Sequence, residues 1–100
     1  MGSNARFASH VLMDVRAIVG KNVRQRRIAA GLSQEELGAR MGVEQYYISG
    51  LEAGRRNPTI ATMALAAVAL GVKISALFES SSRLDAPTKR KRKRKSVRER

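Results

Sequence analysis

The sequence contains no cysteine and no tryptophan, and it has only two prolines in 100 residues. The absence of cysteine excludes a disulfide scaffold and a thiolate metal site, and it agrees with a reducing compartment. No apolar run is long enough to span a bilayer, and the amino terminus lacks the pattern of a secretory signal. We therefore expect a soluble, intracellular protein with one small domain and terminal tails.

Residues suited to catalysis are equally scarce. His10 is the only histidine, and we interpret it as an ordinary surface residue rather than a ligand or a base. The sequence has no glycine-rich phosphate loop, and a chain of this size cannot enclose paired carboxylates in a catalytic pocket. These absences predict that the protein is not an enzyme and uses neither a metal nor a cofactor.

Positive charge is present in excess and is unevenly distributed. The net charge is +12, from 20 basic and 8 acidic residues. Lys89–Arg100 contains nine basic residues and one acid, a balance of +8, and the first 88 residues contain eleven basic and seven acidic residues, a balance of +4. A polyanion is the expected partner of such a chain, and nucleic acid is the commonest polyanion.

The stretch Leu32–Glu52, LSQEELGARMGVEQYYISGLE, predicts two short helices joined by a tight turn. Ser33 and Glu36 have the spacing of a capping box, which opens a helix by satisfying two free backbone N–H groups. Gly42 is suited to the left-handed conformation that ends the first helix. So short a connection forces the helices to cross steeply, and Gly38 stands where the chains would approach most closely.

These residues resemble the phage-repressor and Cro-like (XRE-type) helix-turn-helix family over about Val15 to Phe78. The matching positions share the family's residue types at fixed spacing, and they are Gln34, Leu37, Gly38, Met41, Gly42, Val43, Ile48, Leu51, Glu52, Gly54, Arg56 and Pro58. The resemblance implies an all-α, five-helix, phage-repressor-like domain that binds double-stranded DNA.

The chain divides by composition into three parts. Residues 1–13 have no clear period and are expected to form a flexible lead-in. Residues 14–79 are expected to form the helix-turn-helix domain, whose first helix would run from an N-cap at Asp14 to Ala30, before Gly31. Residues 80–100 are expected to be a polar linker and a disordered polybasic tail, because like charges repel one another.

Arg27 continues an apolar stripe formed by Val15, Val19 and Val23, which is an unusual place for a charge. The resemblance implies that Arg27 pairs with Glu52 at the end of the second motif helix. We therefore expect a partly buried salt bridge that ties the first helix of the domain to the helix that reads DNA.

The resemblance also implies which residues contact DNA. The helix from about Gln45 to Ala53 would enter the major groove, where Gln45 is suited to adenine. The expected base contacts lie on the outward face or at the leading end of that helix, and they are Glu44, Gln45, Tyr46, Ser49 and Gly50. The expected phosphate contacts flank it, and they are Gln34, Tyr47, Arg55, Arg56 and Asn57.

A helix from Thr59 to Leu70 follows, and no charged residue occurs from Ile60 to Val72. A helix that is apolar all round must bury more than one face, which predicts a homodimer interface that includes Leu65 and Val68. Leu77 and Phe78 follow this helix and are placed to close the core, and the resemblance implies that they also meet a partner subunit. Small alanines offer another interpretation, in which the outer face is only mildly apolar. A homodimer would read a palindromic operator with half-sites about ten base pairs apart.

The leading interpretation is a cytoplasmic, nucleoid-associated transcriptional regulator that represses its own or a neighbouring promoter. An alternative is an adaptor of the antitoxin or antiactivator kind, which binds a regulatory protein partner through residues 60–70. A third possibility is that the tail binds RNA or an anionic membrane. We otherwise expect no interaction with membranes.

Overall fold

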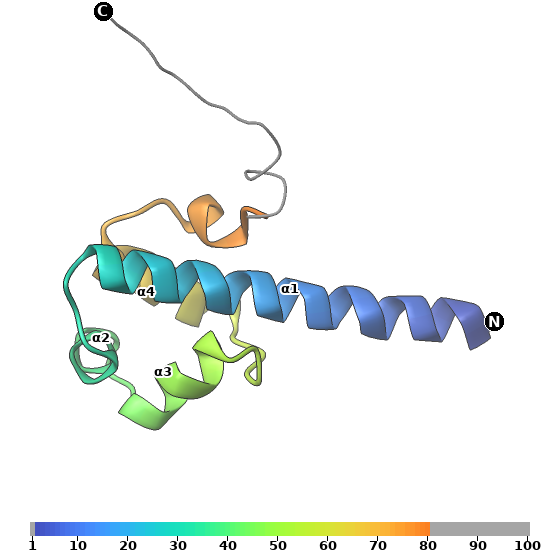
Figure 1. The fold of residues 1–100 in the computed structure, drawn as a ribbon, viewed down its shortest axis with the longest axis horizontal. Helices are drawn as coiled ribbons and strands as arrows, with labels where there is room; N and C mark the ends of the chain where they lie inside the picture. Colours follow the sequence, from blue (N-terminus) through green and yellow to red (C-terminus); the bar gives the residue numbers. More distant parts are fainter. Residues whose placement is uncertain (1, 81–100) are drawn as a thin grey trace, which may run out of the picture.

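The computed structural model describes residues 2–80, which form helices joined by short turns. Four α-helices, α1 (Gly2–Ala29), α2 (Gln34–Met41), α3 (Gln45–Glu52) and α4 (Ile60–Leu70), precede the 3-10 helix η1 (Ile74–Phe78) (Figure 1). Residues 2–80 contain no strand, so the all-α class is confirmed. The fifth helix is a 3-10 turn rather than an α-helix. The predicted disordered tail lies outside the described residues.

Helix α1 begins at Gly2, so the expected helix start at Asp14 is wrong. An N-cap residue is worth only about 1 kcal/mol, and no proline interrupts residues 2–13. Once the second half of α1 is formed, extension adds one hydrogen bond per residue without a new nucleation cost. The division of the chain at residues 13 and 79 remains a prediction.

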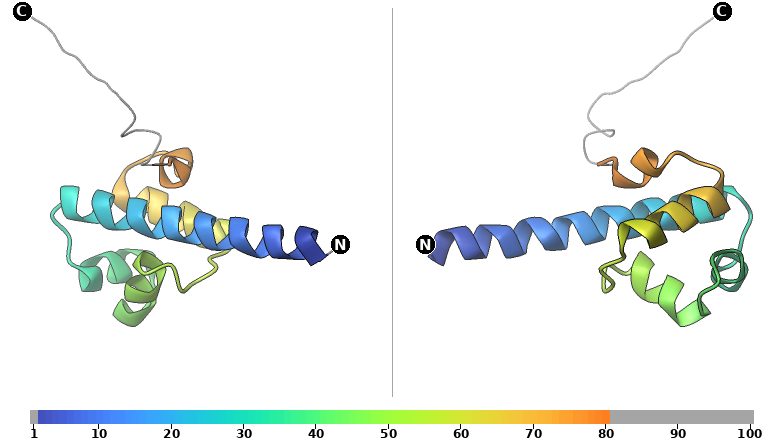
Figure 2. Two further views of the ribbon diagram at one scale, coloured as in Figure 1. Left: turned by 45° about the vertical axis from the view of Figure 1, so that its right-hand side comes forward. Right: turned by 180° about the vertical axis from the view of Figure 1, so that it is seen from behind.

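Helix α1 organises the other elements in space. Helices α2 and α3 lie on one side of α1 and η1 lies on the opposite side, as three views agree (Figures 1 and 2). Helix α4 packs against α2 and η1, and the amino-terminal half of α1 projects beyond the rest of the domain (Figure 1). The predicted helix-turn-helix, α2 and α3, and the carboxyl end of η1 are therefore on opposite sides of one helix.

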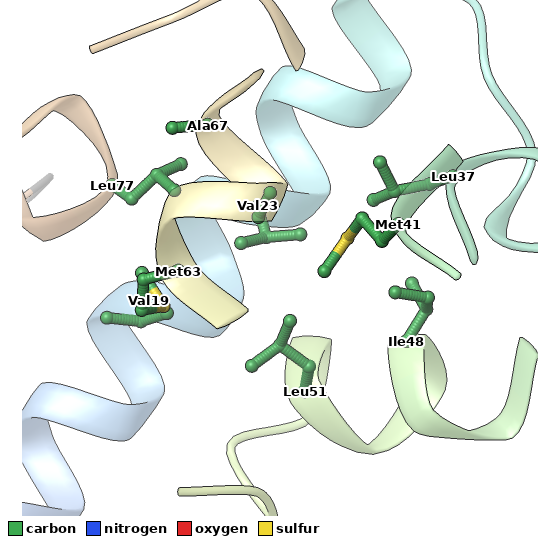
Figure 3. Close-up of a cluster of buried hydrophobic side chains, with 10 residues drawn as sticks. Val19, Val23, Leu37, Met41, Ile48, Leu51, Met63, Ala67 and Leu77 are labelled. Carbon is green, nitrogen blue, oxygen red and sulfur yellow. The ribbon is translucent and has the colours of Figure 1, made fainter. Parts of the chain in front are cut away.

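All five helices contribute to one hydrophobic core (Figure 3). The buried side chains converge from the five elements, and they are Val19, Val23, Leu37, Met41, Ile48, Leu51, Met63, Ala66, Ala67 and Leu77. Each fully buried large aliphatic side chain contributes roughly 1.5–3 kcal/mol relative to its exposed state. The core therefore fixes the angle between α2 and α3, because both helices bury their inner faces in it.

Asn22 is the buried polar residue that attaches η1 to α1. Its side chain is 6% exposed. Its amide nitrogen donates to the carbonyl oxygens of Leu77 at 3.0 Å and Glu79 at 2.7 Å. Both acceptors lie at the carboxyl end of η1, where backbone carbonyls lack helical partners. The sequence analysis missed this residue, since a single asparagine inside a helix has no distinctive pattern.

Candidate nucleic-acid interface

The amino terminus of α2 has the predicted capping box. The hydroxyl of Ser33 accepts from the backbone N–H of Glu36 at 2.9 Å, and the Glu36 carboxylate accepts from the backbone N–H of Ser33 at 2.8 Å. Hydrogen bonding with Ser33 holds the pKa of Glu36 below its ordinary value. The backbone N–H of Ser33 has the larger effect and the Ser33 side chain the smaller one. The box places Gln34 in the first turn of α2, beside free backbone N–H groups that attract anions.

The corner between α2 and α3 depends on Gly42, which has a φ of 76° and a ψ of 28°. This left-handed conformation favours glycine and ends α2, as predicted. The backbone N–H of Val43 donates to the carbonyl of Gly38 at 2.9 Å, which closes the turn. A Cβ atom at Gly38 would lie 2.7 Å from the carbonyl oxygen of Val43, so a larger residue would push the corner open.

A second glycine, Gly20, sets how closely α1 approaches α3. A Cβ atom there would lie 2.4 Å from the carbonyl oxygen of Leu51 and 2.7 Å from that of Glu52. No side chain fits between these backbones, so Gly20 allows the end of α3 to rest directly on α1. The sequence analysis missed Gly20, although a glycine inside a helical pattern is a signal of such close packing.

The two helices that meet at Gly20 are also joined by an ion pair between Arg27 and Glu52. Arg27 Nε donates to Glu52 Oε2 at 2.6 Å and Nη2 donates to Oε1 at 3.0 Å. The side chains are only 12% and 5% exposed. Arg27 Nη1 also donates to the carbonyl of Leu32 at 2.9 Å. The bonds to Glu52 raise the pKa of Arg27, so the guanidinium stays charged.

A chain of hydrogen bonds extends this ion pair to the exposed end of α3. Gln34 Nε2 donates to Glu52 Oε1 at 3.1 Å, and Gln45 Nε2 donates to Gln34 Oε1 at 2.5 Å. Both ends of the Gln34 amide are therefore engaged. Gln45 keeps its carbonyl oxygen and one amide hydrogen without a partner among the described residues. The sequence analysis treated Gln34 and Gln45 as separate DNA contacts and missed the link between them.

The outward face of α3 contains most of the predicted base contacts. Glu44, Gln45 and Tyr46 are exposed, and Ser49 is half-buried. Gly50 is buried, however, and a Cβ atom there would lie 3.1 Å from Nε of Arg56. The Arg56 side chain covers this position, so the outward orientation that we expected for Gly50 is wrong.

The loop after α3 places its cations beside the two tyrosines of that helix. The guanidinium carbon of Arg56 lies 5.0 Å from the ring centre of Tyr47 and 5.8 Å from that of Tyr46. These distances are within the range of a cation–π contact, which limits the motion of Arg56 without neutralising its charge. Arg55 and Asn57 are exposed in the same loop. The predicted phosphate contacts thus border the exposed face of α3.

The residues predicted for a dimer interface differ in their exposure. Val68 is 80% exposed, Leu65 49% and Phe78 46%, whereas Leu77 is completely buried. Leu77 therefore belongs to the core of the single chain, as expected. It offers no surface to a partner, which corrects its additional assignment to the interface. Ile60, which sequence analysis did not single out, is 80% exposed on the same helix as Leu65 and Val68.

Two other features bear on alternative functions. Residues 2–80 contain no group of three or more histidine or acidic side chains arranged to hold a metal ion. Within the same residues, every helix is either too short or too polar to cross a membrane.

Comparison with known proteins connects this geometry to a family. A helix-turn-helix family model matches residues 23–77. The chain is 53% identical over 60 residues to an uncharacterized HTH-type transcriptional regulator, y4dJ, of Sinorhizobium fredii, which covers 60% of this chain and 78% of that protein. The first part of α1 lies outside the family match.

Two solved structures have the same arrangement of helices. The restriction-modification controller protein C.AhdI from Aeromonas hydrophila superposes with a TM-score of 0.63 at 33% identity, over 66% of this chain and 96% of that chain. The master regulator for biofilm formation SinR, solved in complex with DNA, superposes with a TM-score of 0.58 at 29% identity, over 61% of this chain and 98% of that chain.

The expected resemblance is thereby confirmed for more than half of the chain. Members of this family regulate transcription by binding DNA and are not enzymes. The capped α2, the glycine corner and the exposed face of α3 form the helix-turn-helix itself. This chain belongs to the XRE-type helix-turn-helix family of DNA-binding transcriptional regulators.

Proposed function

We propose that the protein is a homodimeric repressor that binds a palindromic operator with α3 in the major groove. The observation that supports this most strongly is the hydrogen-bonded chain from Arg27 through Glu52 and Gln34 to Gln45. It holds an exposed amide in one orientation at the leading end of α3. An amide held in advance loses less conformational entropy when it binds a base edge.

Gln45 is the principal residue for base recognition in this proposal. Its free carbonyl oxygen accepts from adenine N6 and its second amide hydrogen donates to N7, while Gln34 keeps the first hydrogen. Tyr46 is 65% exposed and supplies an apolar surface for a thymine methyl group. Glu44 accepts from cytosine N4, and Ser49 contributes an adaptable hydroxyl.

The remaining contacts position the domain on the phosphate backbone. Gln34 meets a phosphate at the amino terminus of α2, where the unpaired N–H groups attract negative charge. Arg55, Arg56, Asn57 and Tyr47 meet phosphates beyond the other end of α3. Because Arg56 is already held against Tyr47, its charge is positioned before DNA arrives. These contacts determine the register of the domain without reading sequence.

Dimerisation would come from the exposed apolar residues Leu65, Val68 and Phe78. One recognition helix reads only a few base pairs, whereas two copies about 34 Å apart read successive turns of the same groove. In this proposal the protein acts in the cytoplasm, at the nucleoid. Bound at a promoter, the dimer would block transcription of its own or a neighbouring gene.

Selection of bound duplexes from random DNA, followed by footprinting, tests the operator. We expect a palindrome with half-sites about ten base pairs apart. A site without dyad symmetry, bound by one chain, would contradict the homodimer. A promoter reporter with and without the protein tests the sign of regulation, and increased transcription would contradict repression.

The exposure of Val68 and Leu65 also supports the second candidate, an adaptor that binds a regulatory protein through α4. The two functions differ in what copurifies with the chain. A tight, stoichiometric protein partner that is lost on Val68→Lys substitution would favour the adaptor. A second copy of the chain at that surface would favour the repressor.

A further inference from the structure

The domain has an apolar pocket at the point where α1 leaves the core. Its volume is about 140 Å³, and its lining comes from α1, the loop before α4, α4 itself and η1: Val15, Arg16, Val19, Asn57, Pro58, Ile60, Met63 and Phe78. An apolar cavity of roughly 150 Å³ is large enough to hold a benzene molecule, so this pocket can hold one side chain of leucine size.

One lining residue is charged and incompletely satisfied. Arg16 Nε is buried and has no hydrogen-bond partner among the described residues. A buried donor without a partner destabilises the fold, and more so when the group is charged. A ligand that places an apolar side chain in the pocket and a carboxylate against this guanidinium would remove both the exposed apolar surface and the unpaired donor.

The chain itself contains such a ligand a few residues beyond η1. Leu84 is the only hydrophobic residue larger than alanine between Phe78 and Val97, and Asp85 is the only acidic residue between Glu79 and Glu99. The two are adjacent in the sequence. Phe78 lines the pocket, and Leu84 is six positions further along the chain, a reach of at most about 22 Å in an extended chain.

We propose that Leu84 docks in this pocket of its own chain and that Asp85 pairs with Arg16. The apolar side chain covers Ile60, which is 80% exposed. The carboxylate supplies the acceptor that Arg16 Nε lacks. The sequence between Glu79 and Arg83 consists of three serines, whose side chains are small and polar.

Docking would redirect the polybasic tail. Helix η1 ends on the side of α1 opposite to α2 and α3 (Figures 1 and 2). The pocket extends from Phe78 to Asn57, so a docked segment leads from η1 to the loop after α3. Lys89 is only four residues beyond Asp85, at most about 14 Å away. The redirection of the tail matters only if the protein binds DNA, so this consequence rests on the proposed function. The docking of Leu84 does not depend on that function.

Cysteine cross-linking tests the docking without DNA, and the chain has no cysteine of its own. Ala86→Cys is combined with Ile60→Cys at the pocket, and in a control with Ile28→Cys, because Ile28 is also exposed, at 55%, and lies outside both the pocket and the proposed dimer interface. Under oxidised glutathione we expect the intrachain disulfide with position 60 to form at least about tenfold faster. Equal rates at the two positions would overturn the proposal.

Two substitutions added to the pair Ala86→Cys and Ile60→Cys test whether Leu84 and Asp85 are what binds the pocket. Leu84→Ser should lower the rate at position 60 to that at position 28, whereas the control Val97→Ser should leave it unchanged. Asp85→Asn should lower the rate several-fold, and an unchanged rate would overturn the pairing with Arg16. A disulfide between two chains, seen as a species of twice the mass, would overturn docking within one chain. Any of these failures would leave operator binding to be judged separately by footprinting.

Discussion

Arg27 and Glu52 form a two-pronged ion pair, with Nε of the arginine 2.6 Å from one carboxylate oxygen of the glutamate. The pair joins α1 to the last residue of α3. Because Gly20 brings the same two helices into backbone contact, charge and close packing act at one junction. The orientation of the recognition helix relative to the domain is therefore determined at the end farthest from Gln45.

Replacement of Arg27 by methionine should destabilise the fold by about 3–5 kcal/mol, because it leaves the Glu52 carboxylate buried without its charge partner. Chemical denaturation measures this change. The double variant Arg27→Met with Glu52→Leu should recover much of the loss, since an apolar pair of similar size avoids the unpaired charge. A single variant as stable as the original chain would show that the ion pair contributes nothing.

Replacement of Gly20 by alanine should lower stability by about 1–3 kcal/mol, because the new Cβ atom overlaps the carbonyl oxygen of Leu51. This is opposite to the effect of alanine on an exposed helix, where it stabilises by up to about 1 kcal/mol relative to glycine. Thermal unfolding measures the difference. Lys21→Ala, at the exposed neighbouring position, is the matched control and should have little effect. A rise in melting temperature for Gly20→Ala would contradict the close approach.

Replacement of Gln45 by alanine should weaken operator binding by about 1–3 kcal/mol and relax the preference for adenine at one position of each half-site. Gln34→Ala should weaken the same preference, because Gln34 Oε1 holds the Gln45 amide. If the two residues act together, the double variant should lose less than the sum of the single losses. Fully additive losses, measured by titration of labelled duplexes, would show that they act independently.

Replacement of Val68 by glutamate should shift the protein toward a monomer, because a charge at a buried apolar interface is costly. Sedimentation velocity at several concentrations measures this shift. Ile28→Glu changes another exposed apolar residue, 55% exposed on α1, and should leave the oligomeric state unchanged. An equal effect of the two substitutions would place the interface elsewhere or show a general loss of folding.

The stability contributed by Glu36 should depend on pH. Its folded pKa is lowered from 4.5, chiefly by the backbone N–H of Ser33. The contribution is therefore fully present above the unfolded pKa and is lost as the pH falls through the lower folded value. The melting temperature of the original chain should exceed that of Glu36→Gln near pH 7, and the difference should shrink below about pH 4.5. A constant difference between pH 7 and pH 3 would contradict this linkage.

The local chemistry of the motif was readable from the sequence. Ser33 and Glu36 form the predicted capping box, and Gly42 has the predicted left-handed conformation. Each depends on contacts within a few residues, so the type of residue and its spacing are sufficient to predict them. The same reasoning failed at Asp14, because a preference for a helix cap cannot outweigh the propagation of a helix that packing elsewhere supports.

The sequence by itself determined the class of the fold, the helix-turn-helix motif and the excess of positive charge. Only the tertiary structure decided that Gly50 lies under Arg56 and that Gln34 connects Glu52 to Gln45. The physical reason is separation along the chain. Capping and periodicity act over three or four residues, whereas these relationships depend on the angle at which the shared core makes distant helices meet.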